Sequence, residues 1–537
     1  MRLNQEEVVL CDVLVIGGGG AGIRAAIAAK ATGARVMMAS KYRIGQSSNT
    51  NISKGIIACS GLGQSEDNSE VHATDMMSGG RFLNDAPKVA EITRRAVSEI
   101  SFLQKCGVAF GMDGQKFRLM HTSGHRFPRH IYGENWKGSD IVVPLKRYAK
   151  EMGVIFMEHI FITRILTSDK GVAGACGVTP AGDLIPFQAT AVVLATGGYA
   201  HVFRNTNNAP GITGDGQALC YDLGVPLQDM EFVQFYPTAR GKNGTKLLLN
   251  EKLLVQPGVM LKNQHGEDIL KKHGITDFMS LTRDHLAQLM MRESQEGTVY
   301  FDIEALSNEK AIPLTPLLPA PWWKGRKIFP VVPTAHFCMG GVKTDALGQT
   351  SLQGLFAVGE VSAGAHGANR LGGNALAEIF TMGAVAGAAA GTDALAARPS
   401  RMIGPMAKDE KLRLEETCSS TGLPPAHAMR ELKELMWTNA GIIRCPEGLN
   451  YASALLRHPC PEIRITSSPE LIHYLEYLNM RVVSKMVCMA ALKRTESRGS
   501  HYRIDFPGED NEQWLKNIVV QKESSGMVCH TVPVQNA

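Results

Sequence analysis

The first strongly apolar run of the chain leads directly into a cluster of glycines. Residues 12–16 predict a buried β-strand, residues 17–22 a glycine-rich turn, and the alanine-rich residues 23–31 a helix. A second apolar run at 34–39 predicts another strand. The order strand, turn, helix, strand is a βαβ unit, the context in which a Gly-x-Gly-x-x-Gly motif binds a dinucleotide.

Each glycine of this motif has a physical role in such a unit. Gly17 permits the tight turn, Gly19 lets the backbone approach a pyrophosphate, and Gly22 lets the helix pack on the strand with its N-terminus toward the phosphates. The alternative is a glycine-rich turn that binds no ligand. NAD enzymes usually carry an acidic residue at the end of the second strand, but here that strand ends in Ser40 and Lys41, which disfavours NAD.

Two later apolar runs, at 191–198 and 355–360, also end in glycine-containing turns. Together with the first strand they predict one Rossmann-like α/β nucleotide-binding domain. We predict that residues 1–220 and 335–395 form this domain and that an α+β domain, residues 221–334, is inserted into it.

The rest of the chain, residues 396–537, lacks glycine-rich turns. Apolar residues recur every three to four positions from Leu471 to Arg494, which predicts a long helix and a helical C-terminal domain. Within the inserted region, the proline-rich stretch 313–321 and the Trp322-Trp323 pair after it predict a loop.

Composition narrows the class of protein. Hydrophobic residues make up 44% and charged residues 20% of the chain, which excludes disorder, and 55 of 537 residues are glycine. The net charge of +5, without a Lys/Arg stripe interleaved with aromatic residues, makes nucleic acid a poor candidate partner. No apolar run reaches the roughly 18 residues of a membrane span, and Glu6, Glu7 and Asp12 argue against a signal peptide.

The 11 cysteines are scattered without a Cys-x-x-Cys pair. This pattern predicts neither a disulfide framework nor a zinc or iron–sulfur site, so no metal ligand is assigned. A reducing cytoplasm is the expected location, with peripheral attachment to a membrane through partner subunits as the alternative.

Seven motifs in order along the chain resemble the flavoprotein subunit of the succinate dehydrogenase and fumarate reductase family. The motifs are Gly17–Gly22, Thr213–Gly216, Gln234–Thr238, Thr282–Asp284, His336–Gly341, His366–Asn374, and Glu496–His501 with Asp505–Pro507. The family also includes L-aspartate oxidase and adenylylsulfate reductase. The resemblance covers nearly the whole chain, and the block around Arg370 is its most specific part.

The resemblance implies FAD as the cofactor, with either Glu360 or the Ser40-Lys41 pair on the adenosine ribose. The full set of candidate FAD contacts is Gly17, Gly19, Gly22, Ser40, Lys41, Ser48, Asn49, Thr50, Gly55, Ala195, Thr196, Gly197, Asp215, Glu360, Arg370, Asn374, Ala375 and Leu376.

Members of the membrane complexes attach FAD covalently through a histidine in a Ser-His-Thr stretch. This chain has Ser48-Asn49-Thr50 in that place, and an amide side chain cannot form the bond. We therefore expect noncovalent FAD. Loss of the covalent link is expected to lower the flavin potential and to favour reduction of substrate.

The resemblance also implies a chemistry, the movement of hydride between flavin N5 and the C=C or CH–CH of a small carboxylate. It places Arg370 and His336 on the substrate carboxylate and Arg283 as the proton donor to the second carbon. Glu251 occupies the Glu position of the family's proton relay, but Leu254 stands where the relay has a second arginine. The relay is broken or rerouted.

The family's other carboxylate pocket uses a histidine and a threonine, which are Tyr236 and Asn250 here. Both can donate hydrogen bonds but neither carries positive charge. We therefore expect fumarate to be a poor substrate, unless Lys252 or the segment from His121 to His130 supplies a cation.

Without the resemblance, these residues have plainer interpretations. Arg283 would be a solvated or ion-paired helix residue, His336 a buried histidine and Tyr236 a core aromatic. The basic cluster either meets an anionic substrate or covers a surface; it consists of His121, His125, Arg126, Arg129 and His130.

Three functions remain open from the sequence. The first is an FAD-dependent oxidoreductase that acts on the CH–CH group of a small carboxylate. The second is an enzyme resembling adenylylsulfate reductase or L-aspartate oxidase, and the third is a flavin electron conduit in a larger redox complex. An iron–sulfur electron-transfer subunit is the expected partner, because the chain encodes no iron–sulfur ligands itself.

Overall fold

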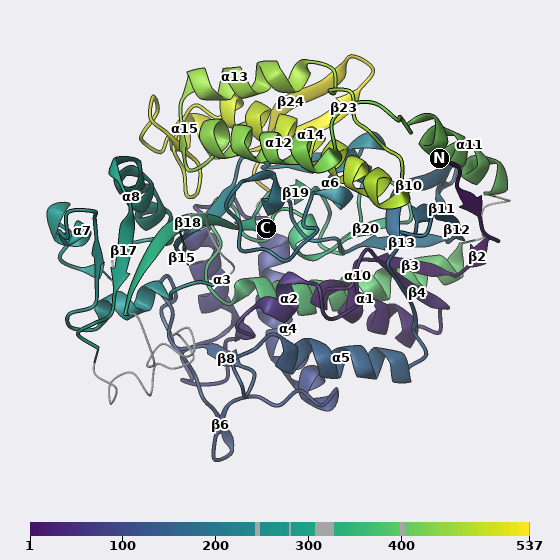
Figure 1. Cartoon of the computed structure of the whole chain (residues 1–537). Helices are drawn as coiled ribbons and strands as arrows, with labels where there is room; N and C mark the ends of the chain where they lie inside the picture. Colours follow the sequence, from purple (N-terminus) through teal and green to yellow (C-terminus); the bar gives the residue numbers. More distant parts are fainter. Residues whose placement is uncertain (242–246, 279–280, 307–326, 398–402, 536–537) are drawn as a thin grey trace.

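We describe a computed structural model of the chain at residues 1–241, 247–278, 281–306, 327–397 and 403–535. Its elements form three regions: a central α/β domain, a capping region on one side, and a C-terminal region rich in helices (Figure 1). The predicted loop from Pro313 to Trp323 lies outside these residues.

The central domain contains a five-stranded parallel sheet in the order β20-β13-β3-β4-β9. Its strands are β3 (Val13–Ile16), β4 (Val36–Ser40), β9 (Ile155–Glu158), β13 (Ala191–Leu194) and β20 (Leu355–Ala357). Four of them are entirely buried, as expected for parallel strands covered on both faces. The three strands that the sequence placed before glycine turns therefore lie side by side, and the Rossmann-like α/β prediction is confirmed.

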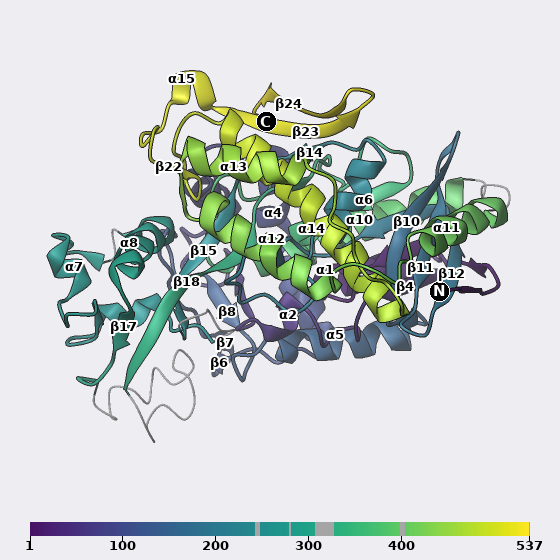
Figure 2. The same ribbon diagram turned by 45° about the horizontal axis from the view of Figure 1, so that its top comes forward.

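Helices cover one face of this sheet, and strands of a second sheet pack against the other face (Figures 1 and 2). The helices on the first face are α1 (Gly20–Ala31), α4 (Ala86–Lys105), α5 (Ser139–Glu151) and α10 (Asn374–Ala396), with α3 (Ser69–Gly79) beside α4. Helix α6 (Asp215–Asp222) packs on α14 (Ser468–Lys493). Among the described helices, α10 alone has the length and hydropathy of a membrane span, but 72% of its most apolar window is buried. It packs between α1 and α4, so it is a core helix.

A second sheet of the central domain is mainly antiparallel and receives the N-terminal strands. Its members are β1 (Asn4–Gln5), β2 (Val9–Leu10), β10 (Phe161–Ser168), β11 (Gly171–Val178) and β12 (Asp183–Gln188). Shorter pairs join β5 (Ile56–Ala58) to β8 (His130–Tyr132) and β6 (Met112–Asp113) to β7 (Lys116–Phe117). The short helix α2 (Asn49–Ile52) follows β4.

In the described residues the capping region is an antiparallel sheet with two α-helices, the α+β architecture predicted for the inserted domain. The sheet order is β15-β18-β17-β16, and the elements are β15 (Val233–Arg240), β16 (Met260–Lys262), α7 (Ile269–Lys272), α8 (Arg283–Glu296), β17 (Val299–Asp302) and β18 (Ile328–Cys338). In the β15–β18 register, Gln234 pairs with Phe337 and Tyr236 with Thr334. This register brings Tyr236 and His336 together, with ring centroids 5.4 Å apart.

The C-terminal region contains the predicted long helix and further helices beside it. They are α11 (Gly404–Glu416), α12 (Pro425–Ala440), α13 (Pro446–Arg457), α14 (Ser468–Lys493) and α15 (Asn511–Trp514). The short strands β21 (Ile443–Arg444) and β22 (Tyr502–Arg503) pair within it.

The helical periodicity of the C-terminal region did not predict two strands that follow its helices. Strands β23 (Lys516–Glu523) and β24 (Gly526–Pro533) form a hairpin, which joins β14 (Leu227–Gln228) and β19 (Gly341–Val342) in one sheet. Alternating apolar residues of β23, such as Ile518 and Val520, fill the core that this pairing creates. The C-terminal region is therefore mainly helical but is fastened to the central domain by a β-hairpin.

Candidate active site

A cavity of about 780 Å³ runs from the glycine turn to the capping region. Predicted site residues that line it are Gly17, Gly19, Ser40, Lys41, Ser48, Asn49, Thr50, Ala195, Thr196, Gly197, Asp215, Tyr236, Asn250, Glu251, Arg283, His336, Glu360, Arg370, Ala375 and Leu376. Gly22, Gly55 and Asn374 are not among the lining residues. Gly22 packs against the turn and Asn374 accepts a hydrogen bond from buried His72.

At the glycine turn the backbone packs too closely for side chains. Gly17 has a φ of 124°, and a Cβ there would lie 2.2 Å from the Ala195 carbonyl oxygen. A Cβ at Gly22 would lie 2.1 Å from the Gly17 oxygen. The hydroxyl of Thr50 accepts a hydrogen bond from Gly20 N at 3.1 Å, which fixes the start of α1. The N-terminus of α1 therefore faces the cavity with bare backbone, as a pyrophosphate requires.

Ser40 and Lys41 lie at the carboxyl end of β4, where dinucleotide folds hold the adenosine ribose. The Lys41 ammonium donates to Asp215 Oδ2 and Glu476 Oε1, both at 2.7 Å, and to Thr213 Oγ1 at 3.0 Å. These carboxylates outweigh the effect of burial and raise the pKa of Lys41 above its usual value. Lys41 is therefore a fixed, compensated cation beside the cavity.

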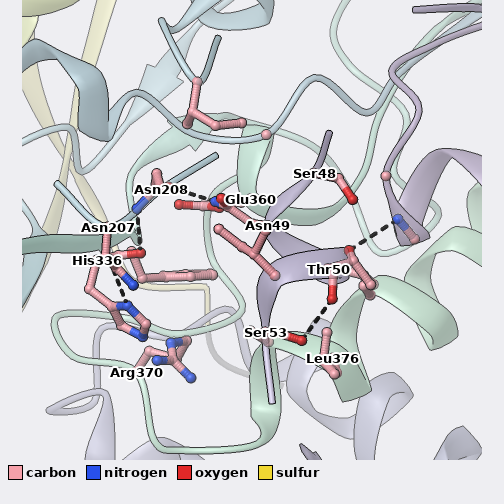
Figure 3. Close-up of a pocket in the computed structure, with 18 of the residues that line it drawn as sticks. Ser48, Asn49, Thr50, Ser53, Asn207, Asn208, His336, Glu360, Arg370 and Leu376 are labelled. Atoms are coloured by element: carbon pink, nitrogen blue, oxygen red, sulfur yellow. Dashed lines mark hydrogen bonds between the residues drawn. The ribbon is translucent and has the colours of Figure 1, made fainter. Parts of the chain in front are cut away.

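Asn49 joins three segments of the chain around the middle of the cavity (Figure 3). Its amide NH₂ donates to Asn208 Oδ1 at 2.5 Å and to Glu360 Oε2 at 3.1 Å, and its oxygen accepts from Ala209 N at 2.9 Å. Glu360 also accepts from Cys338 N at 3.0 Å, and burial raises the pKa of its carboxyl to about 7. The residue at the family's attachment position thus acts as a hydrogen-bonding hub.

Arg283, the first residue of α8, is held by Glu251. Its Nη2 and Nε donate to Glu251 Oε1 at 2.5 and 3.1 Å, and its guanidinium lies 4.8 Å from the centre of the Tyr236 ring. Burial disfavours both charges, but the ion pair dominates, so the pKa of Arg283 is raised and that of Glu251 is lowered. The Tyr236 hydroxyl also interacts with Glu251 and contributes to its lowered pKa.

Arg370 enters the cavity from the loop before α10. Its Nη2 donates to Gln234 Oε1 at 3.0 Å and its Nη1 to the Leu371 carbonyl at 3.2 Å, whereas its buried Nε has no partner in the segments that the structure describes. Burial and the positive charge of Arg283 lower the pKa of Arg370 to about 9. Two guanidinium groups therefore face one cavity, and an anion bound there would relieve their repulsion.

His336 lies beside Arg370 at the end of β18 (Figure 3). Burial, followed by the charges of Arg370 and Arg283, keeps the pKa of His336 well below 6.5. The ring is therefore neutral near pH 7. Its Nδ1 lies 3.2 Å from Asn207 Oδ1, and the amide of Asn208 donates to the His336 carbonyl oxygen at 3.0 Å.

Asn207, Asn208 and Gln234 were not among the predicted site residues. In the sequence, only the Asn-rich stretch 205–208 marked Asn207 and Asn208 as unusual. Gln234 begins the motif Gln234–Thr238, but the sequence assigned no role to its side chain. These three side chains orient His336, Asn49 and Arg370.

The basic cluster supports the loop of Arg370 and contributes no charge to the cavity lining. His125 and His130 contact the Gly372 carbonyl oxygen through Nε2 at 3.1 and 3.0 Å. Arg129 is fully buried and paired with Asp67 and Asp75 at 2.8 and 3.0 Å. Arg126 pairs with Asp75, and His121 contacts the His125 carbonyl oxygen. Of the two sources considered for a missing cation, this cluster does not reach the cavity, and the side chain of Lys252 lies outside the described residues.

The cavity fits a bound dinucleotide on its own chemistry. Bare glycine backbone lies at one end, and the buried Thr196 hydroxyl, which lines the cavity, has no hydrogen-bond partner among the described residues. The buried Nε of Arg370 likewise has no partner among the described residues, which indicates that a second ligand binds in the part of the cavity near Arg370.

Comparisons with known proteins agree with this geometry. The chain matches the family described as "FAD binding domain" over residues 12–376 and "Fumarate reductase flavoprotein C-term" over residues 429–536. It is 32% identical to a "Fumarate reductase (CoM/CoB)" subunit of Methanothermobacter marburgensis, over 97% of this chain and 98% of that protein. It is 30% identical to an L-aspartate oxidase of Saccharolobus solfataricus, over 94% and 97%.

Among solved structures, the FrdA chain of Escherichia coli quinol fumarate reductase superposes with a TM-score of 0.90 at 28% identity. That match covers 99% of this chain and 98% of the other. The chain is an FAD-dependent oxidoreductase and belongs to the succinate dehydrogenase and fumarate reductase flavoprotein family.

Proposed function

We propose that this flavoprotein reduces the activated C=C bond of a small carboxylate. The observation that carries the proposal is the pair of guanidinium groups, Arg283 and Arg370, with neutral His336, in the cavity that begins at the glycine turn. Such a site calls for an anion next to the cofactor. A flavin that only passed electrons between proteins would not need two buried cations in its cavity.

In this proposal the residues between the glycine turn and Asn49 would hold FAD. Ser40 and Lys41, at the end of β4, hold the adenosine ribose, and the N-terminus of α1 holds the pyrophosphate. Asn49, Glu360 and the start of α10 with Ala375 and Leu376 surround the flavin. When bound, FAD supplies a hydride equivalent for one carbon of the double bond.

Arg370 and His336 bind the substrate carboxylate. The guanidinium of Arg370 is oriented by Gln234 and keeps an unpaired N–H, which matches a carboxylate oxygen. His336 carries no charge, and it donates one hydrogen bond to the carboxylate through Nε2–H when the Asn207 amide is turned so that its NH₂ donates to Nδ1. These groups stabilise the negative charge that develops on the carboxylate during reduction.

Arg283 donates the proton to the second carbon. Its contact with Glu251 orients the guanidinium and provides a neighbouring site from which a proton returns. Leu254, buried in the capping core, cannot continue this relay. The Tyr236 hydroxyl is the other described group on Glu251, and we propose that protons reach Glu251 from this side.

Electrons require a partner. Related proteins are named as subunits, and we propose an iron–sulfur electron-transfer subunit for this chain too. We further propose a cytoplasmic location, with any membrane association through partner subunits.

A ligand screen tests the proposed site. Small mono- and dicarboxylates are added to the purified holoprotein, and its thermal unfolding temperature is measured. At least one unsaturated carboxylate should raise this temperature in the wild type and not in Arg370→Ala. A screen in which no carboxylate stabilises the wild type would contradict the proposal.

FAD should leave the protein completely on denaturation, because Asn49 cannot form the covalent bond and is committed to three hydrogen bonds. The check is to precipitate the protein with acid and to compare the flavin in the supernatant with the total. Flavin fluorescence on the polypeptide band of a denaturing gel would show a covalent link instead.

Asn207→Asp should introduce a pH dependence that the wild type lacks. The wild-type His336 is neutral because its pKa is depressed, so kcat/KM should have no limb from this ring between about pH 6 and 8. In this variant a carboxylate lies next to Nδ1 and raises the pKa of His336. The ring therefore gains a proton as the pH falls, and KM decreases at low pH because a cationic ring binds the substrate carboxylate more tightly. Asn207→Ser is the neutral control and should add no limb. An unchanged profile in Asn207→Asp would contradict the assigned contact.

A further inference from the structure

The capping region supplies one wall of the cavity, which we call the capping wall. Its apolar members are Leu247, Leu248, Phe278, Leu281, Leu286 and Phe337, its neutral polar members are Tyr236, Asn250, Thr282 and His336, and its charged members are Glu251 and Arg283. Half of the members of this wall are therefore apolar, and its hydroxyl and amide groups come from residues next to the ion pair.

The charged members of this wall compensate each other. Arg283 Nη2 and Glu251 Oε1 are 2.5 Å apart, and the guanidinium packs over Tyr236. Within the described part of the capping wall no further cation is present. The cavity's other buried guanidinium, Arg370, enters from the opposite domain and is turned toward Gln234.

The cavity would compensate the two charges of a dicarboxylate substrate unequally. One carboxylate would lie at Arg370, with Arg283 near. The second would lose its water against neutral donors, leucine side chains and the Glu251 carboxylate, and such donors compensate a buried charge only in part. An uncharged group avoids this cost and gains burial against Leu248, Phe278 and Leu281, and an ester or amide can also accept a hydrogen bond from the Asn250 amide.

We infer that the preferred substrate is a 2-enoate with a single carboxylate and an uncharged substituent on the far carbon, such as an ester, amide, alkyl or aryl group. The inference rests on the proposed function and narrows its substrate class. Two electrons and two protons add across the C=C bond, as a hydride equivalent from reduced FAD and a proton from Arg283. The carboxylate and the far substituent are unchanged.

Fumarate and monomethyl fumarate provide the test, because they share the trans double bond and differ by one charge. The rates are measured anaerobically with the holoprotein and a reduced viologen dye as electron donor. We expect kcat/KM to be at least about tenfold higher for monomethyl fumarate in the wild type. The double variant Tyr236→His, Asn250→Thr should reverse much of this preference.

A second variant tests the same preference independently, in case the double variant does not fold. Leu248→Arg adds a cation at a half-buried position of the capping wall and should raise fumarate turnover relative to the ester. Efficient fumarate reduction by the wild type that neither change improves would overturn the inference and leave the proposed function intact. Failure of the wild type to reduce any 2-enoate would overturn the proposed function itself.

Discussion

Arg283→Ala is expected to lose roughly 10³-fold or more in kcat while it keeps FAD. General acids commonly contribute about 10² to 10⁴ in rate, and this residue also supplies one of the cavity's two buried guanidiniums. The nearest other acid is Tyr236, whose ring packs against the guanidinium and whose hydroxyl hydrogen is engaged by Glu251, so we expect it not to replace Arg283 as the proton donor. The measurements are viologen-coupled turnover and the flavin-to-protein ratio.

Two further variants separate chemistry from folding. Removal of Arg283 leaves the Glu251 carboxylate buried without its partner, and Arg283→Lys keeps a positive charge there. Arg283→Lys should fold normally and still lose most of its turnover, since one ammonium cannot hold Glu251 and reach the substrate together. Arg292→Ala, an exposed arginine on the same helix, should retain activity. Near-native rates in Arg283→Ala would end the assignment as proton donor.

Arg370→Ala should lower kcat/KM roughly 100-fold or more, which corresponds to a loss of about 3 kcal/mol or more of transition-state stabilisation. The residue combines a charge with an N–H that has no partner in the described part of the chain, and both features are lost on truncation. Burial lowers the pKa of Arg370 to about 9, so its charge is still present at neutral pH. Steady-state rates over a range of substrate concentrations give KM and kcat separately.

Arg370→Lys is the informative control for this effect. It retains the charge but cannot reproduce the fork geometry that Gln234 orients, so it should recover only part of the loss. If Arg370→Ala had unchanged KM and kcat, the carboxylate would have to bind elsewhere.

The parallel sheet could be predicted because its signals are local. An apolar run, a glycine turn and an alanine-rich helix are each readable in a short window, and Gly17 and Gly22 behave as their backbone contacts require. The separate strands 191–194 and 355–357 could be placed in the same sheet because each ended at a similar turn. No comparable local signal marked β9 or the C-terminal hairpin, whose partners lie far away in the sequence.

The side chains that orient the site could not be predicted for the same reason. Asn207 contacts a histidine 129 residues later, and Asn49 contacts a glutamate 311 residues later. A polar residue in a loop gives no indication of such partners. The basic segment from His121 to His130 likewise allowed two interpretations from the sequence. In the structure, the rings of His125 and His130 contact the Gly372 carbonyl oxygen, so they support the Arg370 loop.

We propose that the substrate is reduced in this cavity rather than at a partner subunit. The most direct test is to reduce the holoprotein chemically, mix it anaerobically with 2-enoates, and follow the return of oxidised-flavin absorbance by stopped flow. We predict reoxidation by at least one 2-enoate, at a rate that saturates with concentration and is lost in Arg283→Ala. If artificial electron acceptors reoxidised the flavin while every 2-enoate left it reduced, the chain would be an electron conduit and the proposed chemistry would be wrong.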